Sequence, residues 1–283
     1  GDIIFLELDS DKIKLVEKYL PEQNGKISIK NTSIKYKNSN VNKIFELNGL
    51  YNLEDKFDDF SINQVYKHNE NLHSITGSIN LTNSLVKFEK INYFKKKGKK
   101  SDLNFDISFV PNKKFNILKA EFLSNKDKIF LSNIKFNKDY EINDFDQLTV
   151  KTFLNEIKNN DFEIKKSKQI VASGAVFDSQ SLLKSLYTKS NNEVFSSTFK
   201  SEVKVNFSKV LTGTNDEVSD LSMIANINKG SYNKLSLKGN FSEDEIIEIS
   251  IYQISDNKKT LQVISDRARP FIKNFNFIEG FEG

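Results

Sequence analysis

The two histidines of this 283-residue chain are the first candidates for metal or proton chemistry. His68 and His73 lie five positions apart in a polar stretch, and Glu70 is the nearest acidic residue. A zinc ion needs three or four ligands that converge on one point. Two histidines with this spacing and a single carboxylate fall short of that set. We therefore interpret the pair as residues of a loop or a strand end, and we predict no metal site.

Other catalytic patterns are weak or missing from the sequence. Acidic residues cluster at Glu54-Asp55, at Asp58-Asp59 and between Glu243 and Glu245, where turns are expected, and we interpret them as solvated turns. The chain has no cysteine, no Gly-x-Ser-x-Gly nucleophile motif and no phosphate-binding loop ending in Gly-Lys-Ser/Thr. Thiol chemistry and disulfides are thus excluded. We expect a protein that is not an enzyme and needs no cofactor.

A run of lysines is the strongest charge feature of the sequence. Lys95, Lys96, Lys97, Lys99 and Lys100 surround Gly98 between two expected strands. Such a cluster at a hairpin tip can attract anionic lipid by about 1 kcal/mol per lysine, but it can equally be a solvated turn. We favour the turn and keep anionic lipid as the alternative. Nucleic acid is not expected, because the formal net charge is only +4 and the 24 phenylalanines mostly fit apolar strand positions.

The histidines, acidic clusters and lysines described above must be positioned by strands, which alternate apolar and polar residues. The clearest alternation runs from position 103 to 109. Because alternate strand residues point to opposite faces, one apolar face is expected to contain Ile79, Leu81, Leu103, Phe105, Ile107, Phe109, Leu235, Leu237, Phe241, Ile247, Ile249 and Ile251. A hydrophobic content of 37% and a mean hydropathy of -0.50 are low for a sheet buried on both sides. The sequence therefore predicts one apolar face and one solvated face.

Helix signals interrupt the strands near residues 10–20, 178–188 and 266–276. In the clearest of these, Asp178 can cap a helix that presents Leu182, Leu183 and Leu186. Turn signals such as Asn31-Thr32-Ser33 separate the strands. We predict a mostly β protein: an extended, strongly curved antiparallel sheet that forms an open apolar groove, with three short helices, in two segments at 1–165 and 166–283. The rival architecture is a compact barrel or sandwich.

The sequence also bears on membrane insertion and targeting. The longest apolar runs, such as Ile3 to Leu6, are far shorter than the roughly 18 residues that a membrane helix needs. No basic, apolar and small-residue order typical of a signal sequence is present. The chain opens inside an apparent strand, so we expect a segment of a longer polypeptide whose targeting regions lie elsewhere.

Two segments carry a resemblance to a known family. In residues 263–280 a strand ends in Ser265-Asp266 and a helix start follows, and in residues 175–183 the pair Phe177-Asp178 precedes paired leucines. Both resemble a signature of the bacterial AsmA-like superfamily, in its YhdP and TamB-related branches, over about residues 165–283. The resemblance implies a periplasmic protein, anchored in the inner membrane, whose groove carries phospholipid between the inner and outer membranes.

Two functions from different classes follow. In a lipid conduit, the residues of the apolar face contact acyl chains, and a tail of about fifteen carbons avoids roughly 12 kcal/mol of exposure to water. In the alternative, the chain is a structural or scaffold β domain of a bacterial envelope or surface protein, and the same residues form a dry core. Phospholipid that co-purifies with the chain separates the two.

Overall fold

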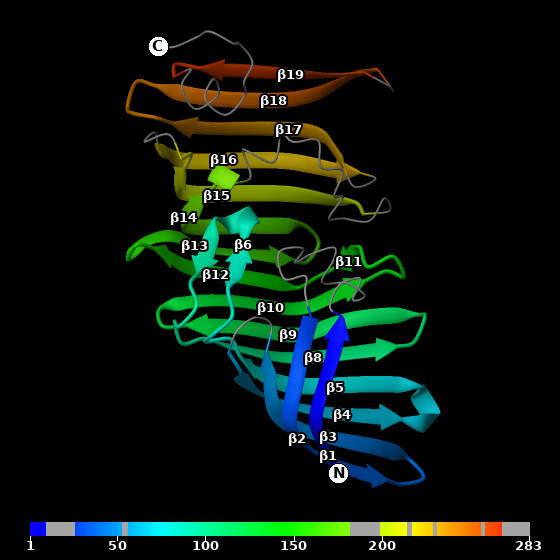
Figure 1. Cartoon of the computed structure of the whole chain (residues 1–283). Helices are drawn as coiled ribbons and strands as arrows, with labels where there is room; N and C mark the ends of the chain where they lie inside the picture. Colours follow the sequence, from blue (N-terminus) through cyan, green and yellow to red (C-terminus); the bar gives the residue numbers. More distant parts are fainter. Residues whose placement is uncertain are drawn as a thin grey trace. The chain divides into compact units, whose positions relative to one another are not determined.

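The computed structural model describes residues 1–9, 26–52, 56–181, 199–213, 217–228, 231–255 and 258–267 (Figure 1). The chain divides into two compact units. Unit 1 comprises Gly1–Phe88 with Phe94–Asp146, and unit 2 comprises Glu89–Tyr93 with Gln147–Gly283. The boundary expected at 165/166 falls inside strand β13 (Ile157–Lys166). The protein is mostly β, and its strands do not close into a barrel.

Unit 1 is an antiparallel sheet in which successive strands pair. Its order is β1 (Asp2–Asp9), β2 (Lys26–Asn38), β3 (Asn42–Asn52), β4 (Asp58–Lys67), β5 (Leu72–Asn80), β8 (Asp102–Val110), β9 (Lys114–Ser124), β10 (Asp127–Phe136) and β11 (Ile142–Asp144). Asparagine makes several of the turns, since it tolerates a left-handed backbone better than most residues do. Asn71 and Asn125 have φ values of 48° and 54° where β4 leads to β5 and β9 to β10.

The expected turn at Asn31-Thr32-Ser33 is wrong. Strand β2 runs unbroken through it, and the three residues form a bulge: Asn31 has φ 49°, and the pairing with β3 shifts register between Lys30 and Ser33. Strand β1 pairs along one side of β2 and β3 along the other. The hydrogen bonds of two flanking strands therefore outweigh the local turn propensity.

Unit 2 is a second series of paired strands. Its order is β12 (Gln147–Leu154), β13, β14 (Ile170–Asp178), β15 (Ser201–Leu211), β16 (Glu217–Asn228), β17 (Ser231–Asn240), β18 (Ile246–Ser255) and β19 (Lys258–Ser265). All these pairs are antiparallel except β14 with β15, which is parallel. A parallel pair needs a longer connection than a hairpin turn, and the chain between Asp178 and Ser201 is long enough for one.

Between β5 and β8 the chain forms a small two-stranded sheet of β6 (Val86–Phe88) and β7 (Tyr93–Lys95), joined by the 3-10 helix η4 (Glu89–Ile91). A second 3-10 helix, η3 (His68–Glu70), joins β4 to β5. Gln180 and Ser181 are helical, and Asp178 Oδ1 accepts a hydrogen bond from the backbone N–H of Gln180 at 3.2 Å. The contact lies where the sequence predicts a helix cap, and the helix expected beyond Ser181 lies outside the described residues.

The rest of the three expected helices cannot be compared with the structure. The 10–20 segment and the segment from 182 to 188 lie outside the described residues, as do residues 268–276. Asp266 and Arg267, which the sequence assigns to the start of the third helix, are described and are not helical. In the described part of the chain, helix is therefore limited to η3, η4 and the two residues after Ser179.

Candidate functional site

A continuous apolar face crosses unit 1. Residues that lie opposite each other on neighbouring strands point to the same side of a sheet, so the strand register defines rows across the sheet. We call the following rows the unit 1 apolar face: Gly49, Phe60, Ile79, Leu103, Phe122 and Ile129; Ile34, Leu47, Ile62, Gly77, Phe105, Ala120 and Leu131; Tyr36, Phe45, Gln64, Ile75, Ile107, Ile117 and Ile134; Tyr66, His73, Phe109, Phe115 and Phe136.

The structure brings most of the expected residues of unit 1 together on this face. Ile79 and Leu103, together with Phe105, Ile107 and Phe109, occupy adjacent rows of β5 and β8, and each is half-buried. Leu81 follows the end of β5 and lies in the loop, where its carbonyl oxygen accepts a hydrogen bond from Lys95. The alternation in sequence thus predicted which strand residues share a face. It did not predict that β5 ends before Leu81.

A glycine on this face makes room for an aromatic ring. A Cβ atom added at Gly77 would lie 2.6 Å from Cζ of Phe105 and 2.8 Å from the carbonyl oxygen of Ser61. The Phe105 ring therefore lies directly over Gly77 on the neighbouring strand. Glycine permits this close approach because it has no side chain.

Aromatic side chains form one margin of the unit 1 apolar face. The ring centroids of Tyr66 and His73 are 4.5 Å apart, and His73 stacks on Phe109 at 4.6 Å with an interplanar angle of 4°. Farther along the same row, Phe115 and Phe136 lie 5.5 Å apart. The Nδ1 atom of His73 is 2.9 Å from Nε2 of Gln64. His73 is therefore part of an aromatic row near the start of β5, which agrees with its interpretation as a strand-end residue.

A second apolar face crosses unit 2. Its longest row contains an apolar residue from each of the strands β12 to β19: Leu148, Ile164, Ala172, Val205, Met223, Leu237, Ile249 and Val263. Two further rows flank it: Ile170, Val203, Ala225, Leu235, Ile251 and Leu261; Val150, Phe162, Gly174, Phe207 and Leu221. We call these residues the unit 2 apolar face.

The expected residues of unit 2 also lie on this face, with one exception. Leu235, Leu237, Ile249 and Ile251 are half-buried members of its rows, and Ile247 is 7% exposed and pairs with Gly239. Phe241 follows the end of β17, and its ring centroid lies 5.4 Å from the guanidinium carbon of Arg267. Phe241 is thus a turn residue in a cation–π contact.

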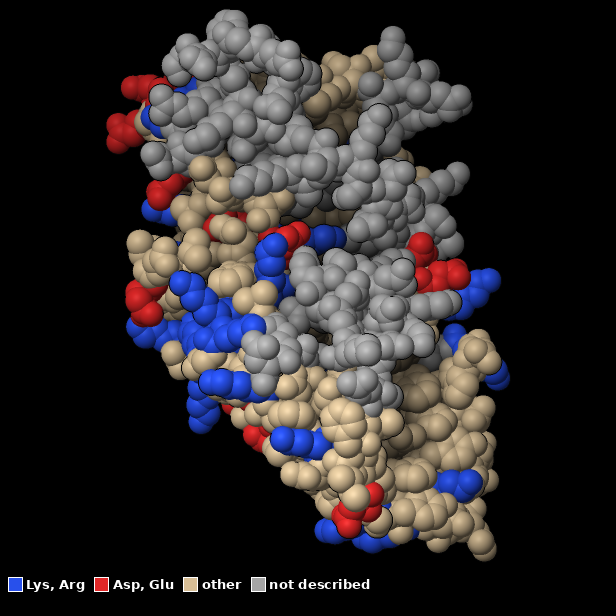
Figure 2. All heavy atoms as spheres, in the orientation of Figure 1, with Lys and Arg blue, Asp and Glu red and all other residues tan. Residues whose placement is uncertain are grey.

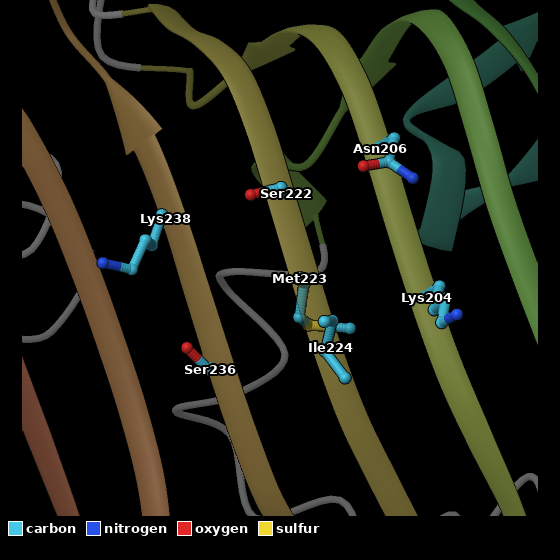
Figure 3. A pocket seen from close by; sticks show the side chains of 7 residues that line it. All are labelled: Lys204, Asn206, Ser222, Met223, Ile224, Ser236 and Lys238. Atoms are coloured by element: carbon cyan, nitrogen blue, oxygen red, sulfur yellow. The ribbon is translucent and has the colours of Figure 1, made fainter.

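The opposite face of each sheet is polar. Its charges often pair across strands, as in Lys135 with Asp144 at 3.0 Å and Lys238 with Glu248 at 2.7 Å. A shallow, open depression on this face crosses β15, β16 and β17 and is lined by Lys204, Asn206, Ser222, Met223, Ile224, Ser236 and Lys238 (Figure 3). Its side chains bring no acid, base or nucleophile set together, so it suggests no chemistry.

The lysine run does not lie wholly on the surface. Lys95 is 0% exposed, and its ammonium group donates to the carbonyl oxygens of Leu81, Thr82 and Lys99. Burial lowers the pKa of Lys95 to about 8. The ammonium group of Lys99 lies 2.7 Å from Oδ2 of Asp127. Two of the five lysines therefore hold the loop together, a role that no local pattern in the sequence signals.

Two buried groups support the same loop in unit 1. The backbone N–H of Asn83 donates to Asp58 Oδ2 and the Asn83 side chain to Asp58 Oδ1, both at 2.8 Å. The hydroxyl of Tyr51 donates to the carbonyl oxygen of Asn80 at 2.7 Å, and burial raises the pKa of Tyr51 to about 12. Asp58, assigned from the sequence to a solvated turn, is instead 6% exposed. Its buried carboxylate fixes the loop after β5.

A buried polar cluster lies beside the unit 2 apolar face. Asp178 accepts hydrogen bonds from the side chains of Asn92 at 2.7 Å and Asn159 at 3.3 Å. Asn160 donates to Thr152 Oγ1 at 2.9 Å and to the carbonyl oxygen of Ile91 at 2.7 Å. These bonds fasten the η4 turn to β12, β13 and β14. The sequence indicated Asp178 as a helix cap, but not the asparagines that surround it.

No protein-family model matches the chain, and no curated protein or solved structure shows significant similarity to it. Within the described ranges, no three His, Asp or Glu side chains come together in a way that could hold a metal ion. No helix in the same ranges is long and apolar enough to cross a membrane. The two apolar faces are the candidate functional site, because the strand register brings most of the residues expected from the sequence together on them.

Proposed function

We propose that this chain is a segment of a non-enzymatic lipid-transfer protein that holds phospholipid acyl chains on its apolar faces. In this proposal the chain belongs to the AsmA-like superfamily, with its YhdP and TamB-related branches. The full-length protein is anchored in the inner membrane and acts in the periplasm. Its sheet is curved into an open groove along which phospholipid passes between the inner and outer membranes.

The observation that carries the proposal is the continuity of the rows. The row from Leu148 to Val263 has an apolar residue at each of its positions. Strands lie about 4.8 Å apart, so an acyl chain that moves along such a row keeps apolar contact at every strand. Exposing an acyl tail of about fifteen carbons to water costs roughly 12 kcal/mol of free energy. A continuous row removes most of that barrier.

The exposure of the faces is consistent with a ligand site. Of the twelve residues predicted to line a groove, Ile247 is buried and the other eleven keep partial contact with solvent. In the described part of the chain the one further sheet is the small β6–β7 pair. Other members of the two faces, such as Phe122, Val150 and Phe162, are buried. The half-buried part of each face is therefore the part that an apolar partner can contact. The polar opposite face keeps the sheet in water.

The experiment is a lipid analysis of the purified chain. We expect native mass spectrometry to detect masses that match bound phospholipid, and organic extraction to recover the same lipid. The matched control is an unrelated soluble β protein expressed and purified in the same way. If no phospholipid is recovered, and if the chain does not take up a fluorescent phospholipid from detergent, the lipid proposal fails and a scaffold domain with a dry core replaces it.

A further inference from the structure

Two basic turns of unit 1 lie against each other. The first, residues 96–100, joins β7 to β8, and the second joins β9 to β10 around Asn125 and Lys126. The Lys99 ammonium group contacts Asp127, which is 2% exposed, at 2.7 Å. The hydroxyl of Ser124 donates to the carbonyl oxygen of Lys100 at 3.0 Å. These contacts fix the two turns side by side, although they are far apart in sequence.

Together the turns concentrate positive charge on one part of the surface. The exposed lysines of the two turns and of the start of β10 are Lys96, Lys97, Lys100, Lys126 and Lys128, and they are here called the two-turn basic patch. Within it, the Lys128 ammonium group pairs with Glu121 at 2.8 Å. Segments 95–100 and 124–128 contain no acidic residue except Asp127. Figure 2 shows lysine and arginine side chains gathered over the area where Figure 1 draws the β6–β7 hairpin. The two turns therefore concentrate positive charge that the formal net charge of only +4 for the whole chain does not reveal.

An exposed aromatic side chain adjoins this charge. Phe94 lies two residues before the first turn and is 42% exposed, whereas Tyr93 and Lys95 on either side of it are 2% and 0% exposed. An exposed apolar ring close in sequence to a lysine cluster is typical of surfaces that contact anionic bilayers, because the ring can enter the interface while the ammonium groups meet phosphates. Binding to single-stranded nucleic acid needs several aromatic stacking platforms, and Phe94 alone is not such a set.

We propose that the two-turn basic patch docks on the surface of an anionic phospholipid bilayer. The inference extends the proposed lipid function, because it gives the chain a place where it meets the membrane that supplies or receives lipid. It also changes the residues expected from the sequence. Lys95 and Lys99 serve the loop structure, and Lys126 and Lys128 join the contact surface.

The test is co-sedimentation with vesicles. The probes are vesicles of phosphatidylcholine alone and of phosphatidylcholine mixed with phosphatidylglycerol. We expect binding to the mixed vesicles that weakens as salt rises. Each lysine near an anionic surface contributes about 1 kcal/mol, so the triple variant K96Q/K100Q/K126Q should bind roughly 100-fold more weakly. The control variant K151Q/K168Q/K204Q removes three exposed lysines elsewhere and should bind nearly as well as the parent chain.

Several results would overturn the inference. These are equal binding to both kinds of vesicle, equal losses in the two triple variants, displacement by inorganic phosphate alone, or tighter binding to a single-stranded oligonucleotide than to vesicles. Thermal unfolding is used to check that both triple variants are folded. Lipid extraction and uptake distinguish the two proposals. Bound or acquired phospholipid without vesicle binding refutes only the docking inference. A chain that neither carries phospholipid nor takes up the fluorescent phospholipid refutes the proposed function, whatever the vesicles show.

Discussion

Replacing both Phe105 and Ile107 by aspartate places two carboxylates near the middle of the unit 1 apolar face. Burying a Phe or Ile side chain fully contributes about 1.5–3 kcal/mol, and both residues are half-buried. Each replacement therefore loses roughly 1 kcal/mol of apolar burial, and partial desolvation of the charges adds to this loss. We expect the double variant to lose about 3 kcal/mol of folding free energy. A domain with about 5–15 kcal/mol of stability remains folded after such a loss.

The assay compares folding and lipid binding in the same variants. Urea unfolding gives the change in stability, and native mass spectrometry gives bound phospholipid. The control variant S61D/S222D adds two carboxylates at exposed positions on the polar faces of β4 and β16, where they meet water. We expect it to keep both its stability and its lipid. The face variant should stay folded and carry much less lipid, because carboxylates disrupt contact with acyl chains.

The reasoning is refuted if the face variant fails to fold while the control folds and the parent chain carries no phospholipid. Unpaired carboxylates in a dry core are costly enough to unfold a domain. That combination of results would mean that the unit 1 apolar face is packed against other parts of the protein. A folded face variant that keeps all its lipid would instead place the lipid site elsewhere.

Three structural predictions concern buried groups. Replacing Lys95 by Met should cost about 3 kcal/mol in urea unfolding, because buried carbonyl oxygens lose their donor at roughly 1–3 kcal/mol each. Lys96→Met, an exposed control, should change stability by less than about 0.5 kcal/mol, and equal effects would contradict the burial of Lys95. Burial holds the pKa of Lys95 at about 8, below its ordinary 10.5. The stability linked to this group is therefore fully present above pH 10.5 and is lost as pH falls through about 8. The stability of the parent chain relative to Lys95→Met should rise with pH across that window, and a difference that does not change with pH would refute the shift. Asp178→Ala should cost about 3 kcal/mol by leaving buried N–H donors without an acceptor. Asp178→Asn keeps one oxygen and should cost less. Thermal unfolding that ranks the two variants in the reverse order would contradict the role of Asp178 as the acceptor of the buried cluster.

The sequence was sufficient to predict the apolar faces. Alternation from Leu103 to Phe109 fixes which side chains share a side, because the backbone geometry of any strand has a period of two residues. It cannot indicate which strands are neighbours. The row that joins Phe105 to Gly77 and Ala120 arises from strand register, and register depends on hydrogen bonds between segments distant in the chain.

Residue type and apolar alternation are local properties, and the sequence alone determined them. Tertiary structure decided the rest. It made Asn31 a bulge in β2, because paired strands on both sides outweigh a turn signal. It placed Lys95 inside unit 1 among three carbonyl oxygens and left Lys96 exposed. Adjacent lysines in one run look alike in sequence, and only the fold determines which of them loses its contact with water, since desolvation depends on the atoms that surround a charge.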